Sequence, residues 1–118
     1  MCENNIASVR KFIGRNVEVF IDRPKGSHHP EYNDMVYEVN YGYLPGTTGG
    51  DGEEIDIYIL DEDMPVKTCK AKVIAVIMRS DDNEFKLVGV TKDSYYSDSE
   101  IKQKTDFVEK YFKSTILR

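Results

Sequence analysis

Residues 39–60 read VNYGYLPGTTGGDGEEIDIYIL and are the most informative stretch of the chain. After a glycine-rich turn, three isoleucines alternate with other residues, which is the period of a β-strand. These are Ile55, Ile57 and Ile59. Before the turn, residues 35–43 also have the composition of an extended segment. The stretch therefore predicts two extended segments joined by the loop PGTTGGDG, residues 45–52.

Three more segments have the character of strands. Val17, Val19 and Ile21 alternate with Glu18 and Phe20, and the loop RPKGSHHP, residues 23–30, interrupts this pattern. Residues 69–78 and 85–90 are rich in valine and isoleucine, and RSDDNE between them is typical of a hairpin turn. Together with the opening stretch, these segments predict five strands.

Helical spacing is found near both ends of the sequence. At the start, one helical face is predicted for Ile6, Val9, Phe12 and Ile13, and Gly14 is a stop signal. Near the end, apolar side chains recur at three and four residues at Phe107, Val108, Tyr111, Phe112 and Thr115 or Ile116. Ser97 followed by Glu100 predicts a capping box at the start of that helix. The sequence thus predicts a mainly β protein with α, a small barrel with a C-terminal amphipathic helix packed on it.

The composition narrows the functional classes. A chain of 118 residues suits a single domain, 1–118, and no apolar run approaches the roughly 20 residues that span a bilayer. The first residues lack a secretory signal, and Cys2 and Cys69 form no motif, so we expect a cytoplasmic protein with reduced thiols and no membrane contact. A net charge of −5 argues against nucleic-acid binding. An acidic protein binds an anionic substrate when metal cations lie between the two.

Four carboxylates lie within six positions of the opening stretch, at Asp51, Glu53, Glu54 and Asp56. A flat strand would not bring them together, but the adjoining glycines let the chain curl so that they converge. Converging carboxylates repel one another unless cations lie among them, and hard oxygen ligands suit magnesium, manganese or calcium. The spacing is not that of an EF-hand. A solvated acidic turn is the alternative interpretation.

A second acidic group and a set of tyrosines complete the candidate site. Asp81, Asp82 and Glu84 lie in the predicted hairpin, followed by Lys86. They form a solvated turn unless the barrel places the hairpin beside the first acidic group. Tyr37, Tyr41 and Tyr43 fall on one side of an extended segment, and a phenol both packs its ring and donates a hydrogen bond to a phosphate or to a metal-bound water.

These residues resemble a known family. The segment YEVNYGYLPGTTGGDGEEID, residues 37–56, is similar to the part of soluble family I inorganic pyrophosphatases that carries an Asn-Tyr-Gly-Tyr motif and an Asp-Gly-Asp-Pro-x-Asp signature. The similarity continues in EFKLVGV and, more weakly, in FVEKYFK. It implies a closed five-stranded OB-like β-barrel that holds several Mg²⁺ ions, with Mn²⁺ as an alternative. The resemblance also implies hydrolysis of pyrophosphate by metal-activated water. It is compatible with assembly into a homo-oligomer.

The resemblance assigns roles residue by residue. The implied metal ligands are Asp22, Asp51, Asp56, Asp81 (or Asp82) and Glu84. Glu53 takes the position of the aspartate beside the attacking water, and Tyr41 lies beside it as a second catalytic residue. The implied substrate-binding residues are Tyr37, Lys86 and Tyr111, with Lys113 near the place of a phosphate-binding lysine.

Two departures from the family pattern bear on the function. Glu53 is one methylene longer than the family's aspartate, and a misplacement of about 1 Å costs on the order of a hundredfold in rate. The loop after Asp22 is shorter than in the family, so Arg23, Lys25, His28 or His29 would replace the usual phosphate-binding lysine and arginine. Two alternatives therefore stay open: a hydrolase of another phosphoanhydride such as a nucleotide, or a non-catalytic metal- or phosphate-binding module.

Overall fold

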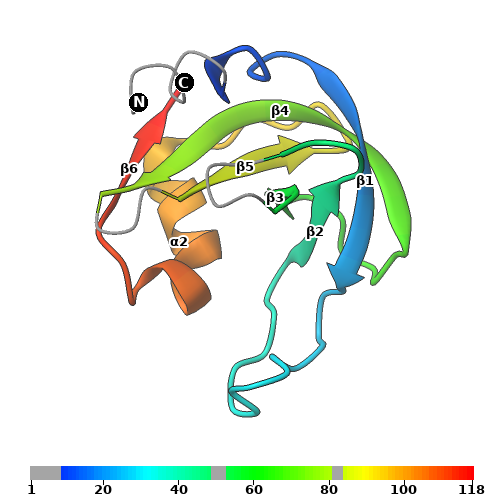
Figure 1. The fold of residues 1–118 in the computed structure, drawn as a ribbon, viewed down its shortest axis with the longest axis vertical. Helices are drawn as coiled ribbons and strands as arrows, with labels where there is room; N and C mark the ends of the chain where they lie inside the picture. Colours follow the sequence, from blue (N-terminus) through cyan, green and yellow to red (C-terminus); the bar gives the residue numbers. More distant parts are fainter. Residues whose placement is uncertain (1–8, 49–52, 81–83) are drawn as a thin grey trace.

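The computed structural model in Figure 1 describes residues 9–48, 53–80 and 84–118. Within these residues, six strands form one sheet in the order β1-β2-β3-β5-β4-β6. The strands are β1 (Asn16–Arg23), β2 (Asn40–Leu44), β3 (Ile55–Ile59), β4 (Thr68–Arg79), β5 (Phe85–Val90) and β6 (Ser114–Leu117). The helix α2 (Asp98–Glu109) lies between β5 and β6 in the sequence.

The sheet closes on itself because β1 pairs with both β2 and β4. The pairing of β1 with β4 is antiparallel and aligns Val17 with Ala71 and Val19 with Cys69. β3 and β5 run parallel, and the other neighbours run antiparallel. The first five strands therefore form the closed five-stranded barrel that the sequence predicted, and β6 extends β4 outside the ring.

Two apolar clusters explain why the central strands are apolar on both faces. One cluster fills the barrel and includes the fully buried Val19, Ile57 and Leu87. The other lies between the barrel and α2 and joins Val88 to Ile101, among others. Every residue of β5 is buried, because one face of the strand points into the barrel and the other is covered by the helix (Figure 1).

Gly42 and Asn40 have structural roles in the Asn-Tyr-Gly-Tyr segment. Gly42 pairs with Ile21 where β1 crosses β2 closely, and a Cβ atom on Gly42 would overlap the backbone carbonyl of Phe20. The fully buried Asn40 accepts a hydrogen bond from the backbone N–H of Lys25 (2.9 Å) and donates to the carbonyl of Met64 (2.9 Å). These two residues hold β2 against β1 and against the loops that flank it.

The chain between β1 and β2 is not an extended arm. Only residues from Asn40 onward join β2, although residues 35–43 were predicted to be extended throughout. Before Asn40 the chain folds on itself through an isolated bridge between His28 and Val36, and a hydrogen bond from the His29 N–H to the Met35 carbonyl (2.9 Å). The resulting β1–β2 loop, residues 24–39, projects from the end of the barrel (Figure 1).

The helix predictions were partly right. The capping box of Ser97 and Glu100 at the start of α2 is confirmed. The extension of the helix to Thr115 or Ile116 was wrong: α2 ends at Glu109, and residues 114–117 pair with the end of β4, placing Ile116 opposite Ile77. Hydrogen bonding to an open strand edge outweighed the helical period of the sequence.

The predicted helix at the start of the chain lies partly outside the described residues. Of the described part, Val9 and Arg10 are helical, and turns follow up to Gly14. Gly14 has a φ of 90°, a left-handed conformation that glycine adopts without strain, which fits its predicted role as a stop.

Candidate functional site

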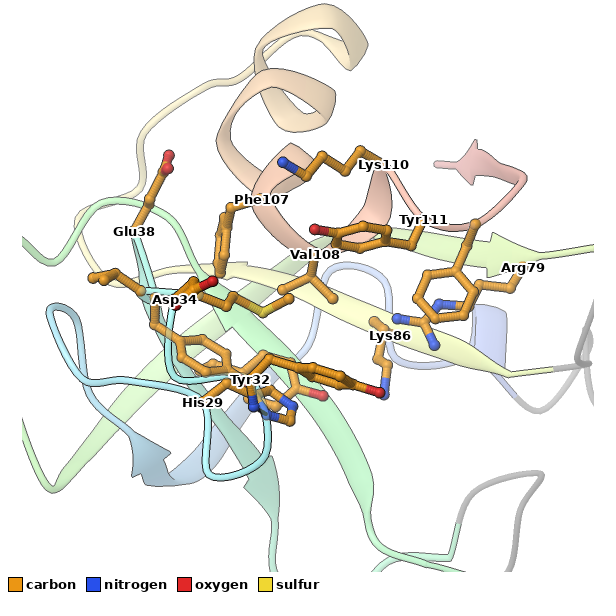
Figure 2. A pocket seen from close by; sticks show the side chains of 15 residues that line it. His29, Tyr32, Asp34, Glu38, Arg79, Lys86, Phe107, Val108, Lys110 and Tyr111 are labelled. Carbon is orange, nitrogen blue, oxygen red and sulfur yellow. Dashed lines mark hydrogen bonds between the residues drawn. The ribbon is translucent and has the colours of Figure 1, made fainter.

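A pocket of about 900 Å³ lies between the β1–β2 loop and the C-terminal turn of α2. The two sides face each other in Figure 2, with His29 and Tyr32 on the loop side and Lys110 and Tyr111 on the helix side. The side chains of Arg79 and Lys86, from β4 and β5, lie at one end of the pocket. The pocket thus joins segments from three distant parts of the sequence.

Aromatic rings form the wall of the pocket over the barrel. Tyr37 and Tyr41 lie with ring centroids 5.5 Å apart, and Tyr37 meets Phe107 of α2 edge-on at 5.6 Å. Tyr41 in turn meets the fully buried Tyr58 edge-on at 5.0 Å. Because these rings interlock across β2, β3 and α2, they hold the two tyrosine hydroxyls in set positions.

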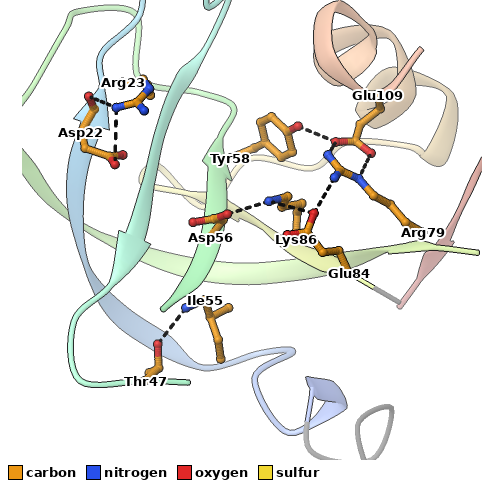
Figure 3. A network of polar contacts seen from close by, with 10 residues as sticks. All are labelled: Asp22, Arg23, Thr47, Ile55, Asp56, Tyr58, Arg79, Glu84, Lys86 and Glu109. Atoms are coloured by element: carbon orange, nitrogen blue, oxygen red, sulfur yellow. Dashed lines mark hydrogen bonds and ion pairs between the residues drawn. The ribbon is translucent and has the colours of Figure 1, made fainter. Parts of the chain in front are cut away.

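A lysine and two carboxylates meet beside this wall (Figure 3). The amino group of Lys86 lies 2.6 Å from a carboxylate oxygen of Asp56 and 3.7 Å from one of Glu84. The Lys86 side chain is 7% exposed, whereas Asp56 and Glu84 are about a third and a quarter exposed at 31% and 26%. Both carboxylates are therefore partly open to solvent.

A buried ion pair between Arg79 and Glu109 adjoins Glu84, one of these two carboxylates (Figure 3). Arg79 donates two hydrogen bonds to Glu109, at 3.1 and 2.7 Å, and one to Glu84 at 2.6 Å. The hydroxyl of Tyr58 also donates to Glu109, at 2.6 Å. The Arg79 guanidinium lies 3.7 Å from the centre of the Phe112 ring. Arg79 thus links α2 to the hairpin that carries Glu84.

Two residues at the end of β1 lie near the same carboxylates. Burial raises the pKa of Asp22, Arg23 lowers it, and the nearby charges of Asp56 and Glu54 raise it again, so that the net shift is upward. Arg23 contacts Asp22 at 3.7 Å, and its Nε atom is buried without a hydrogen-bond partner in the described structure. An unsatisfied guanidinium nitrogen beside the site is suited to a ligand oxygen.

Tyr41 remains a hydrogen-bond donor at any ordinary pH. Burial first, and then the neighbouring charge of Asp56, hold the pKa of the Tyr41 hydroxyl far above its usual range. Burial likewise raises the pKa of Tyr37, while Arg23 lowers it and the net shift is upward. Both phenols are therefore neutral donors rather than bases.

The charge balance of the site fits a cation. Among the described residues, the carboxylates of Asp22, Glu54, Asp56, Glu84 and Glu109 lie near the cations Arg23, Arg79 and Lys86. An anionic ligand would meet an excess of negative charge unless a cation joined it. Across residues 9–48, 53–80 and 84–118, however, no three carboxylate, histidine or cysteine side chains are close enough to hold a metal ion. Two predicted ligands, Asp51 and Asp81, and the alternative Asp82, lie outside these ranges.

The structure places the predicted site residues in three groups. Tyr37, Tyr41, Lys86 and Tyr111 line the pocket. The second group lies beside it and consists of Asp22, Arg23, Asp56 and Glu84. The third group is exposed and does not line this pocket; it consists of Glu53 before β3, Lys25 in the turn after β1, and Lys113, which lines a separate pocket of about 370 Å³.

Sequence reasoning missed Arg79, Glu109 and Lys110. Lys110 lines the large pocket where Lys113 does not. Arg79 and Glu109 are 30 positions apart, and both are buried. One signal was present: Glu109 is an acid in the last turn of a helix, where the helix dipole disfavours negative charge, so a cationic partner was to be expected.

Fold and pocket together define a class: small closed barrels with a polar pocket at one end, in which tyrosines and buried cations adjoin carboxylates. The chain belongs to the inorganic pyrophosphatase family, whose family model matches residues 17–117. The solved inorganic pyrophosphatase of Ehrlichia chaffeensis has the same fold, with a TM-score of 0.67 at 21% identity over 86% of this chain and 84% of that one.

Sequence relatives carry the same family name. The inorganic pyrophosphatase of Corynebacterium glutamicum is 28% identical over 114 residues, which is 80% of this chain and 72% of the relative. That of Nanoarchaeum equitans is 33% identical over 81 residues, 56% of this chain and 51% of the relative. The chain spans between 37% and 72% of the length of five such relatives.

Proposed function

We propose that this protein hydrolyses inorganic pyrophosphate to two phosphate ions, with Mg²⁺ as the cofactor and Mn²⁺ as a substitute. The observation that carries the proposal is the meeting of Lys86 with Asp56 and Glu84 next to the pocket wall of Tyr37 and Tyr41, with the Lys86 amino group 5.7 Å from the centre of the Tyr41 ring. Carboxylates that reach solvent can hold metal ions, and a buried cation beside them can bind a phosphate oxygen; phosphoryl transfer uses both. The family match covers all five of these residues.

The carboxylates are proposed to hold the metal ions. Asp22, Asp51, Asp56, Asp81 (or Asp82) and Glu84 are the proposed ligands, and Glu53 would orient the attacking water. When bound, Mg²⁺ would neutralise phosphate charge and lower the pKa of a bound water. Burial first, and then the neighbouring charges of Asp56 and Glu54, raise the pKa of Asp22, and a bound cation would offset these charges.

The cations and phenols are proposed to hold the substrate. Lys86 would donate to a phosphate oxygen from its position between two carboxylates, and the unsatisfied Nε atom of Arg23 would donate to another. Tyr37, Tyr41 and Tyr111 would donate hydrogen bonds through their hydroxyls, and Lys110, which lines the pocket where Lys25 and Lys113 do not, would add positive charge. These donors orient the anhydride and stabilise charge on its oxygens.

The first test is phosphate release from pyrophosphate with and without Mg²⁺. Wild type should release phosphate only with the metal, and Asp56→Asn should lose at least a hundredfold in kcat, since it removes a charge without changing volume. Glu53→Gln should also lose turnover. Asp98→Asn, an exposed acid at the start of α2, is the matched control and should change nothing.

Three results would contradict the proposal in different ways. Unchanged activity in Asp56→Asn would show that the charge of this carboxylate is not needed for hydrolysis. Activity without a divalent metal ion would show that the reaction does not need the proposed cofactor. No release from pyrophosphate at all, with Mg²⁺ binding retained by calorimetry, would make the chain a binding module.

Three further expectations accompany the function. We propose that residues 1–118 act as one domain, because the barrel and β6 form one sheet and an apolar cluster joins this sheet to α2. Cytoplasmic location and a homo-oligomer also remain proposals. Among the described residues, no helix is both long enough and apolar enough to cross a membrane.

A further inference from the structure

The pocket is larger than the proposed substrate requires. Its volume of about 900 Å³ is near the upper end for sites that enclose drug-sized ligands, which occupy roughly 300–1,000 Å³. Pyrophosphate is much smaller and carries no apolar surface. It would occupy the end near Lys86 and leave the rest of the pocket without a ligand.

The rest of the pocket has a different chemistry from the Lys86 end. In Figure 2, Lys86 and Arg79 lie at one end, and Asp34 and Glu38 lie at the other. Between the two ends, aromatic rings approach from both sides. The loop side presents His29 and Tyr32, and the helix side presents Phe107 and Tyr111. A matching ligand would have an anionic end, a flat middle and a group that donates hydrogen bonds.

The aromatic residues on the loop are held in place by local hydrogen bonds. The Nδ1 atom of His29 accepts from the backbone N–H groups of Glu31 (3.0 Å) and Tyr32 (3.2 Å). The His29 ring stacks on Tyr37 with an angle of 7° between the planes at 6.2 Å, and it contacts the Tyr32 ring at 5.0 Å. Although the Tyr32 side chain is 62% exposed, its backbone is therefore fixed at the pocket edge.

We propose that this pocket takes a nucleoside 5′-diphosphate or triphosphate, with the terminal phosphoanhydride near Lys86 and the base between Tyr32 and Tyr111. The proposal rests on the proposed function for the chemistry at the Lys86 end. Rings on both sides stack on a base, and the carboxylates of Asp34 and Glu38 accept hydrogen bonds from its amino group or from ribose hydroxyls. The phosphate groups extend toward the cations.

The reaction is the same as with pyrophosphate. The oxygen of a water molecule forms a bond to the terminal phosphorus, and the bond from that phosphorus to the bridging oxygen breaks. The electron pair of the broken bond stays with the nucleotide, and one proton of the water is released to solvent at neutral pH. The products are inorganic phosphate and the nucleotide shortened by one phosphate, so water is the only co-reactant.

Tyr32 is the residue through which the proposal is tested, because it lines the pocket from the loop side and is not one of the residues to which the proposed function assigns a role. Phosphate release is measured from ADP, ATP and pyrophosphate with Mg²⁺, for wild type, Tyr32→Ala and Tyr32→Phe. The ratio of kcat/KM for ADP to kcat/KM for pyrophosphate should fall about tenfold in Tyr32→Ala, the size of one lost base–aromatic stack. Tyr32→Phe keeps the ring and should restore the ratio. Tyr95→Ala, a 79% exposed tyrosine outside the pocket lining, is the matched control.

Binding is measured independently of turnover with α,β-methylene-ADP, which cannot be hydrolysed at its bridge. Saturation transfer from the protein to the adenine H8 and H2 protons reports contact with the base. It should be strong in wild type and in Tyr32→Phe and weak in Tyr32→Ala.

The outcomes separate this proposal from the proposed function. Pyrophosphate hydrolysis with neither ADP turnover nor base contact would overturn the nucleotide proposal and leave the proposed function standing. Base contact that depends on Tyr32, without hydrolysis of any substrate, would refute the proposed function and support the nucleotide site. Equal effects of Tyr32→Ala and Tyr95→Ala on the ratio or on the transfer would overturn the assignment of the base to this pocket.

Discussion

Replacement of Arg79 by methionine should destabilise the fold strongly. Methionine retains most of the side-chain volume but removes the hydrogen bonds to Glu109, at 2.7 and 3.1 Å, and to Glu84. The Glu109 side chain is 6% exposed, so it would stay buried with the Tyr58 hydroxyl as its remaining hydrogen-bond donor among the described residues. Breaking a buried pair from one side costs about 3–5 kcal/mol.

The cost is measured by urea unfolding. With a slope of about 1–3 kcal/mol per molar urea for a small domain, a loss of 3 kcal/mol lowers the midpoint by about 1–3 M. Lys72→Met is the matched control, since it removes a lysine whose ion pair with Asp93 is exposed and 3.6 Å long. Such a surface pair contributes about 0–1 kcal/mol.

The double variant Arg79→Met with Glu109→Gln isolates the buried charge as the cause. Glutamine keeps an oxygen that accepts the Tyr58 hydroxyl, but it carries no charge, so at least about 2 kcal/mol should be recovered. Our account of the network would be wrong if Arg79→Met cost no more than Lys72→Met. It would also be wrong if the double variant were no more stable than Arg79→Met alone.

Further predictions concern the elements that position the site. Gly42→Ala should cost at least about 1–3 kcal/mol in thermal or urea unfolding, because its Cβ would overlap the carbonyl of Phe20, and a loss under 0.5 kcal/mol would contradict this. Ser97→Ala should cost about 1 kcal/mol through loss of the capping box of α2, with reduced helix signal in circular dichroism. Burial raises the pKa of Asp61, but hydrogen bonds from the loop after β5 outweigh it and hold the pKa below 3.8. Asp61→Asn should therefore be less stable than wild type above about pH 4, and the difference should shrink as the pH falls through the lowered pKa. Urea unfolding across this pH range measures the difference, and Asp93→Asn, at an exposed acid, is the control variant.

The sequence predicted the strands more completely than it predicted the residues of the site. Tyr37, Tyr41 and Lys86 were selected from their residue types and from the family pattern, and all three line one pocket. The contribution of Lys110 in place of Lys113 was not predictable, because it depends on where α2 ends. A helical period continued through residues 110–116, and only the open edge of β4 turned the last of them into a strand.

The sequence by itself determined the local elements and the kind of chemistry. Alternating isoleucines predict the strand β3, and Ser97 with Glu100 predicts the capping box at the start of α2. Carboxylates that are close in the sequence predict a site for cations. The closure of the barrel between β1 and β4 and the burial of Arg79 against Glu109 were decided only by the tertiary structure. These depend on partners about 30 positions or more apart in the chain, and the energy of a buried charge is set by its surroundings rather than by its neighbours in sequence.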